Sequence, residues 1–225
     1  MSIIVALDYT NPLEALEMAA KLRDHVDGFK INHALWSQSV YIKDYTDKEL
    51  FIDCKLWDTP NTIRTVVEKI IAKGATMTTI STFNNPEVFD TLNQYNNDIQ
   101  LLGVTSLTSW SSVEELQLYK ETSYDIWKEH IGKIIHNFAG IVCSVPDLHY
   151  IDRIDPDFNL IRVCPGIKYE TKLKGQSKTA TPREAYELGA DYLVIGRSVT
   201  QASDPVEKVK EIYDSLHSLF RSSRI

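Results

Sequence analysis

Eight short apolar segments recur along the 225 residues of the chain, and each is followed by a stretch with helical spacing or a helix-start signal. The first is apolar at five successive positions, as expected for a strand covered on both faces of a parallel sheet. The segments cover residues 3–8, 28–32, 50–56, 77–82, 100–107, 140–144, 160–164 and 191–195. A strand–helix unit repeated eight times in a chain of this length predicts a closed, parallel (β/α)8 barrel, the TIM barrel.

Capping signals mark where helices begin between these segments. Asn11-Pro12 and Thr181-Pro182 each place a capping side chain before a proline, and a glutamate follows three residues after the cap. No linker or low-complexity run divides the chain, so a single domain over residues 1–225 is expected. The alternative is an open doubly wound sheet, but the glycine fingerprint of a dinucleotide-binding fold is absent after the first segment.

Composition limits the classes of partner and compartment. The net charge of −7 argues against nucleic acid and against an anionic membrane surface, but not against a small anion held by local basic groups. Cys54, Cys143 and Cys164 are odd in number and widely spaced, which argues against disulfides or a zinc site and favours buried thiols. The chain starts without a signal-peptide pattern and has no apolar run of roughly 18 residues. We therefore expect a cytoplasmic protein without a membrane span.

The third segment carries charges that an apolar strand rarely tolerates. Asp53 and Lys55 are two residues apart, so on a strand their side chains point to the same face. Asp58 follows in the next loop, just before Pro60 opens a helix. Burying such charges is costly unless they are paired or used. The motif by itself is compatible with a structural ion pair or with a catalytic site.

Polar residues also end most of the other predicted strands. In a TIM barrel, catalytic groups come from these carboxyl ends and from the loops that follow them. Besides the third segment, the residues at these positions are Asp8, Lys30, Thr108, Ser144 and Arg197. One shared site would gather them, whereas several independent coincidences would be needed for all of them to be structural.

Two loops near the C-terminal end of the chain suggest a phosphate site. Gly196-Arg197 stands between the eighth strand and its helix, where backbone amides and a guanidinium can bind an anion. The loop after the seventh strand is rich in amide and ammonium groups, namely Lys168, Lys172, Lys174, Gln176 and Lys178. In an acidic chain this cluster predicts a flexible lid over an anion, although exposed loop lysines are also common.

The string Asp53-Cys-Lys55-Leu-Trp-Asp58-Thr-Pro-Asn-Thr62 is highly specific to one family. With it, nearly the whole chain resembles the orotidine 5′-phosphate (OMP) decarboxylases, which make UMP in pyrimidine biosynthesis. Further matching positions are Asp8, Lys30, Gln176 and residues 104–109, 140–144, 165–167 and 195–197. The resemblance implies a TIM-barrel carboxy-lyase that acts on OMP without a metal or an organic cofactor.

The resemblance also implies catalytic roles. Lys30, Asp53, Lys55 and Asp58 match the family's tetrad of alternating charges. Asp58 would be donated across a homodimer interface into the neighbouring site. Lys55 would protonate C6 of the pyrimidine, and Asp53 would lie against the departing carboxylate. A fixed ammonium near that carbon can stabilise the developing carbanion and then supply the proton.

Substrate-binding roles follow in the same way. Asp8 and Lys30 match residues that bind ribose hydroxyls, and Thr62 would reach the site from the partner subunit. The remaining matches are Thr108 at the pyrimidine and Gln176, Gly196 and Arg197 at the phosphate. Lys168 stands where the family usually has arginine, which leaves bidentate phosphate binding at that position open.

Some positions depart from the family pattern and leave two alternatives. Residues 80–85 replace a His-Ala…Gly-Gly type segment, and Asn32 replaces a common glycine. One alternative is a Mg²⁺-dependent sugar-phosphate decarboxylase or aldolase of the same superfamily, but those enzymes need an acid on the second strand, where this chain has Lys30. The other is a non-catalytic barrel that binds phosphorylated metabolites, and the intact charged tetrad argues against it.

Overall fold

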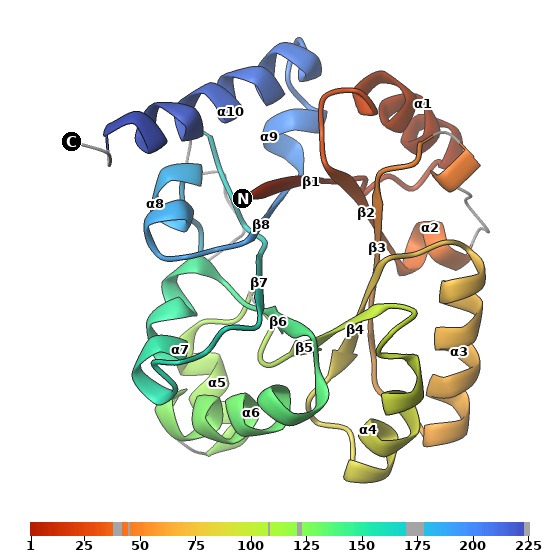
Figure 1. Ribbon diagram of the computed structural model, residues 1–225, viewed down its shortest axis with the longest axis vertical. Coiled ribbons are helices and arrows are strands. Elements are labelled where there is room, and N and C mark those ends of the chain that lie inside the picture. Colours follow the sequence, from red (N-terminus) through yellow and green to blue (C-terminus); the bar gives the residue numbers. More distant parts are fainter. Residues whose placement is uncertain (38–41, 45, 108, 121–122, 170–177, 223–225) are drawn as a thin grey trace.

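The computed structural model describes residues 1–37, 42–44, 46–107, 109–120, 123–169 and 178–222. Eight parallel strands close into a barrel in the order β1 to β8, and helices surround the ring (Figure 1). The strands are β1 Ser2–Ala6, β2 Gly28–Asn32, β3 Glu49–Leu56, β4 Met77–Ser81, β5 Gln100–Val104, β6 Gly140–Val142, β7 Ile161–Cys164 and β8 Tyr192–Ile195. The predicted (β/α)8 barrel is confirmed, and β8 pairs with β1 to close it.

The helices occupy the connections between strands. They are α1 Pro12–Leu22, α2 His33–Ser37, α3 Pro60–Ala72, α4 Pro86–Leu92, α5 Ser112–Tyr119, α6 Ser123–Asn137, α7 Leu148–Ile154, α8 Pro182–Glu187, α9 Arg197–Thr200 and α10 Pro205–Ser222. Three 3-10 turns, η1 Ile42–Asp44, η2 Asn93–Tyr95 and η3 Val145–Asp147, complete the described elements. Within the described ranges, no helix combines the length and apolar character that a membrane span requires.

The predicted helix starts are confirmed by their side-chain caps. The Asn11 side chain accepts a hydrogen bond from the amide of Leu13, and Thr181 forms a capping box with Glu184. Gly74 ends α3 with a φ of 74°, a left-handed conformation that glycine adopts without a Cβ clash. The predicted helix start at Pro60 is the first residue of α3, whereas β5 ends at residue 104 rather than at 107.

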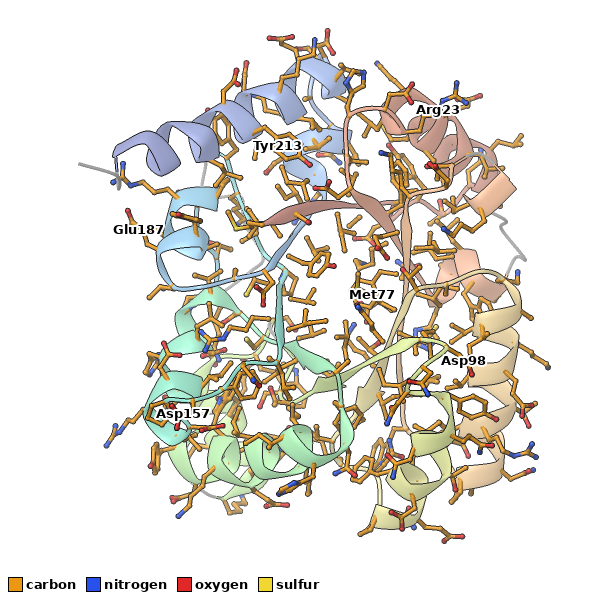
Figure 2. All side chains as sticks on the ribbon, viewed as in Figure 1. Arg23, Met77, Asp98, Asp157, Glu187 and Tyr213 are labelled. Carbon is orange, nitrogen blue, oxygen red and sulfur yellow. The ribbon has the colours of Figure 1, made fainter. Side chains whose placement is uncertain are left out.

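Side chains alternate between the inside of the barrel and the helix layer, as the period of a strand requires. The interior holds Ile4, Ala6, Phe51, Met77, Leu102, Val104, Val142, Val163 and Val194. Figure 2 shows Met77 within the ring of strands and Glu187 and Asp157 at the periphery. The alternate positions, such as Ile3 and Val5 of β1, pack between the barrel and its helices. The apolar interior therefore forms a floor beneath the carboxyl ends of the strands.

Candidate active site

A pocket lies at the carboxyl ends of the strands, above the apolar interior. Its charged lining consists of Asp8, Lys30, Asp53, Lys55, Lys168 and Arg197. Four of these side chains are cationic and two are acidic, so the lining has a surplus of two positive charges in a chain of net charge −7. The structure thus brings together charged residues from the loop after β1, from β2 and β3, and from the two segments predicted to bind phosphate. This local excess of positive charge suits an anionic small molecule.

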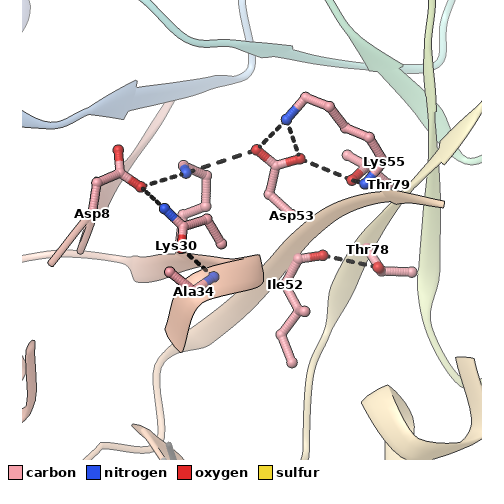
Figure 3. Close-up of polar contacts among 9 residues, drawn as sticks. Asp8, Lys30, Ala34, Ile52, Asp53, Lys55, Thr78 and Thr79 are labelled. Atoms are coloured by element: carbon pink, nitrogen blue, oxygen red, sulfur yellow. Dashed lines mark hydrogen bonds and ion pairs between the residues drawn. The ribbon is translucent and has the colours of Figure 1, made fainter. Parts of the chain in front are cut away.

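Four of these side chains form a continuous array of alternating charge (Figure 3). The Lys30 ammonium donates a hydrogen bond to Asp8 over 3.1 Å and lies 3.7 Å from an oxygen of Asp53. The Lys55 ammonium donates to both oxygens of Asp53 over 2.8 Å. The Asp53 carboxylate therefore lies between two ammonium groups, and the array reads Asp8, Lys30, Asp53, Lys55.

The environment of Asp53 favours the ionised carboxylate. Burial alone raises the pKa of this carboxyl, since a charge is poorly solvated inside the protein. The charges of Lys55 and Lys30 and the hydrogen bonds from Lys55 and Thr79 outweigh burial, so the pKa lies below its usual value. The Asp53 side chain is 12% exposed and that of Lys55 is 39% exposed. Lys55 is thus the more accessible member of the pair.

Strand β3 is irregular at the residues that carry this pair. Ile52 pairs with Thr78 and Leu56 pairs with Ile80. An advance of four residues along β3 therefore corresponds to an advance of only two residues along β4. This bulge contains Lys55, which has a φ of 47°, in the left-handed region that costs a non-glycine residue about 1–3 kcal/mol. Bulges of this kind redirect side chains and occur next to active sites. Asp53 and Lys55 still line one pocket, as predicted from their spacing.

The loop after β7 brings Lys168 into the pocket. The backbone amide of Lys168 donates to the carbonyl of Ala180 over 2.9 Å, and Ile167 forms an isolated bridge with Ala180. Gly166 has a φ of 78° and lies close to the Lys178 carbonyl, which an added Cβ would approach to 2.9 Å. Hydrogen bonds therefore join the start of the loop, at Ile167 and Lys168, to its end at Ala180. Lys168 is buried there, with only 8% of its surface exposed.

Lys178 does not have the predicted role of a lid lysine. Its ammonium donates to Glu115 over 3.1 Å and to Asp147 over 2.9 Å, and its side chain is 12% exposed. The two carboxylates raise its pKa against the opposing effect of burial. The Ser144 hydroxyl joins this cluster by donating to Asp147 over 2.6 Å. Lys178 and Ser144 are thus engaged outside the pocket lining, which corrects the prediction for both.

Asp58 and Thr62 lie outside the pocket of their own chain. Both are exposed, and the Asp58 carboxylate accepts a hydrogen bond from the amide of Thr59 over 2.6 Å. The Thr62 hydroxyl lies 3.0 Å from that of Thr59. Trp57 beside them is 73% exposed. A role for Asp58 and Thr62 in catalysis therefore requires a second subunit and stays a prediction.

Predictions for four further residues remain open. Thr108 and Gln176, expected at the pyrimidine and the phosphate, lie outside the described residues. Lys172 and Lys174 lie outside them as well. Gly196 lines the pocket beside Arg197. Among the described residues, an added Cβ there would meet only Ala6, at 3.7 Å, so the pocket has room for a ligand beside Gly196.

Comparison with known proteins decides the family. A sequence model described as "Orotidine 5'-phosphate decarboxylase / HUMPS family" matches residues 1–212. The chain belongs to this family. A protein named orotidine 5′-phosphate decarboxylase from Glaesserella parasuis is 32% identical over 95% of this chain and 98% of its own length. The protein of the same name from Wigglesworthia glossinidia brevipalpis is 30% identical over 96% and 98%.

Solved structures of the family share the fold. The orotidine 5′-phosphate decarboxylase of Lactobacillus acidophilus superposes with a TM-score of 0.80 at 24% identity and covers 95% of this chain and 97% of its own. The enzyme of the same name from Pyrococcus horikoshii gives a TM-score of 0.76 at 22% identity, over 96% and 99%. At these identities the likeness establishes the barrel, while the function rests on the closer sequence relatives.

The residues that sequence reasoning missed lie on β4 and just after it. Thr79 donates to Asp53 and accepts from the Lys55 amide. Asn84 is 5% exposed. Its side chain donates a hydrogen bond to the Leu56 carbonyl and accepts one from the Asp58 amide, so it connects the segment after β4 to the end of β3 and the loop that follows. The available signal was Thr79 itself, a polar residue two positions after Met77 and hence on the same face of the strand.

Proposed function

We propose that the chain decarboxylates orotidine 5′-phosphate to UMP, with Lys55 as the proton donor. The observation that carries this proposal is the array of Asp8, Lys30, Asp53 and Lys55 along one wall of a cationic pocket. Its relatives at 30–32% identity carry the name of that enzyme. Breaking the bond between C6 and the carboxylate leaves an electron pair on C6. The Lys55 ammonium, held beside that position, would stabilise the negative charge and then transfer a proton to C6.

Asp53 would act on the substrate carboxylate. A fixed, ionised carboxylate beside the substrate carboxylate repels it, and the repulsion is relieved when CO2 leaves. Asp53 keeps its charge because two ammonium groups flank it. Asp8 and Lys30, at the other end of the array, would bind the ribose hydroxyls. Binding at these remote groups would hold the reacting end of OMP in place.

The alternative from the same superfamily, a Mg²⁺-dependent sugar-phosphate enzyme, fits the pocket less well. Such an enzyme needs carboxylates that converge on a cation, including one from β2. Here Lys30 of β2 places its own ammonium between Asp8 and Asp53. Among the described residues, no cluster of three or more histidine, cysteine, aspartate or glutamate side chains is arranged to hold a metal ion. The position of the Lys30 ammonium, where such an enzyme would have a carboxylate, is what favours the metal-free reaction.

The assay that tests the function compares these substrates directly. Purified protein treated with EDTA should convert OMP to UMP, followed by the change in ultraviolet absorbance. The same protein should be inactive on 3-keto-L-gulonate 6-phosphate with Mg²⁺ added. Activity on the keto-sugar phosphate together with silence on OMP would overturn the proposal.

A phosphate grip at Arg197 and Lys168 completes the proposed site. Arg197→Ala is expected to lower kcat/KM for OMP about 10- to 100-fold, the usual value of a charge-assisted hydrogen bond. For orotidine, which lacks the phosphate, kcat/KM should fall less than about twofold. Orotidine cannot make the contact that Arg197→Ala removes. Steady-state kinetics with both substrates measure this.

Arg183→Ala provides the matched control for Arg197→Ala. Arg183 lies on α8, pairs with Glu187 and is 67% exposed. Its replacement should leave both substrates unaffected. An equal loss of activity on OMP and orotidine in Arg197→Ala would contradict a role at the phosphate.

We also propose a homodimer with shared active sites and a cytoplasmic location. Asp58, Thr62 and Trp57 are exposed beside the pocket-forming strand β3 rather than turned into their own pocket, which suits residues that act on a neighbouring subunit. Cys54, Cys143 and Cys164 are free, buried thiols, as is usual in a reducing compartment.

A further inference from the structure

The hydroxyl of Thr79 joins the two central charged residues of the site from a neighbouring strand. It lies 2.8 Å from the backbone amide nitrogen of Lys55 and 2.9 Å from a carboxylate oxygen of Asp53 (Figure 3). An amide N–H can only donate, so the hydroxyl must accept there, and its own proton is left for Asp53. Both hydrogen bonds therefore have a fixed direction, and the single proton of the hydroxyl goes to Asp53.

The bulge in β3 explains why a side chain is needed at this place. Between the Ile52–Thr78 and Leu56–Ile80 pairs the regular ladder is interrupted, so a backbone carbonyl of β4 is out of register with the Lys55 amide. Thr79 is fully buried and faces the barrel interior, on the same face of β4 as Met77. Its side chain supplies the acceptor that the ladder does not.

We propose that Thr79 is a positioning residue. Its hydroxyl fixes the left-handed backbone of Lys55 and the carboxylate of Asp53 relative to each other, in the arrangement that decarboxylation needs. The inference rests on the proposed function of Lys55 and Asp53. Lys55 keeps a φ of 47° in the bulge, and the Thr79 hydroxyl opposes relaxation toward an ordinary extended strand. It also fixes one oxygen of the carboxylate that receives the Lys55 ammonium.

Thr78 is a control that matches Thr79 closely. It is the preceding residue, has the same side chain and is fully buried. Its hydroxyl donates to the carbonyl of Ile52 over 2.8 Å and faces the helix layer rather than the pocket. A valine at either position keeps the shape and removes the hydroxyl. The two variants thus differ mainly in whether the lost hydrogen bonds reach the charged array.

The experiment measures kcat and KM for OMP in wild type, Thr79→Val, Thr79→Ser and Thr78→Val. We expect Thr79→Val to lower kcat about 100-fold, the effect of misplacing reacting groups by roughly an ångström, with KM changed less than about threefold. Thr79→Ser keeps the hydroxyl and should restore kcat to within about fivefold of wild type. Thr78→Val should keep wild-type kcat, with thermal unfolding recorded for all variants.

The outcomes separate this inference from the proposed function. Wild type silent on OMP would refute the proposed function itself. Wild type active together with an active Thr79→Val, or with equal losses in Thr79→Val and Thr78→Val, would overturn the positioning role alone. If Thr79→Val does not fold, Thr79→Ser and Thr79→Ala are compared instead. An active Thr79→Ser together with a folded Thr79→Ala of low kcat supports the positioning role. Equal activity in these two variants overturns it.

Discussion

Lys55→Ala is expected to lower kcat for OMP by at least about 10⁴-fold, because one substitution removes two effects at once. Loss of a proton donor costs about 10²- to 10⁴-fold, and loss of a fixed charge at the developing carbanion costs a further 10²- to 10³-fold or so. Asp53 would also lose a partner that donates to both of its oxygens over 2.8 Å. Stopped assays at high enzyme concentration measure the residual rate.

Two variants make the result for Lys55 specific. Lys55→Arg keeps a positive charge but not a group that releases a proton readily, so it should remain at least about 10³-fold below wild type. Lys69→Ala removes an exposed lysine on α3 and should be fully active. Binding of UMP, measured by calorimetry, should persist in Lys55→Ala and show that the pocket is intact. More than about one hundredth of wild-type kcat in Lys55→Ala would exclude it as the proton donor.

A hybrid of two inactive subunits should regain activity if Asp58 completes the neighbouring site. Lys55→Ala and Asp58→Asn should each be inactive alone, the second by about 10²-fold or more through loss of a charge at the array. Co-expressed with different affinity tags and purified through both, the hybrid contains one site with native Lys55 and native Asp58 and one with neither. Its activity should be about half that of wild type, since one of two equivalent sites is intact.

The same experiment can fail in two informative ways. If no doubly tagged species is recovered, the homodimer is wrong. If the hybrid forms and stays inactive, the sites are not shared through Asp58. A hybrid of Lys55→Ala with Asp53→Asn is the control, since both residues line one pocket and neither site would then be complete.

The sequence predicted the barrel because the signals for it are local. A strand buried on both faces is apolar at successive positions, and a helix start needs a capping side chain within a few residues. Asn11 and Thr181 cap the helices predicted from them. The spacing of Asp53 and Lys55 likewise predicts a shared face from the period of a strand. Each of these inferences depends on neighbours in the chain, which the sequence displays directly.

Contacts between distant segments were beyond the reach of such signals. Lys178 is typical of a loop lysine, yet it lies between Glu115 and Asp147, which are 63 and 31 residues away. Thr79 stands 26 residues from Asp53 and differs from Thr78 only in the face of β4 that it occupies. Its function depends on the pairing of β4 with an irregular β3, which no short pattern encodes.

The sequence by itself therefore determined the eightfold strand–helix order, the carboxyl end of the barrel as the place of the site, and the identity of the charged residues there. Only the tertiary structure decided that Lys30 lies between Asp8 and Asp53 and that β3 bulges between Ile52 and Leu56. It also decided that the Thr79 hydroxyl bonds to the Lys55 amide and to the Asp53 carboxylate. The physical reason is that periodicity and capping act within one turn or strand, whereas ion pairs and register depend on which strands become neighbours when the barrel closes.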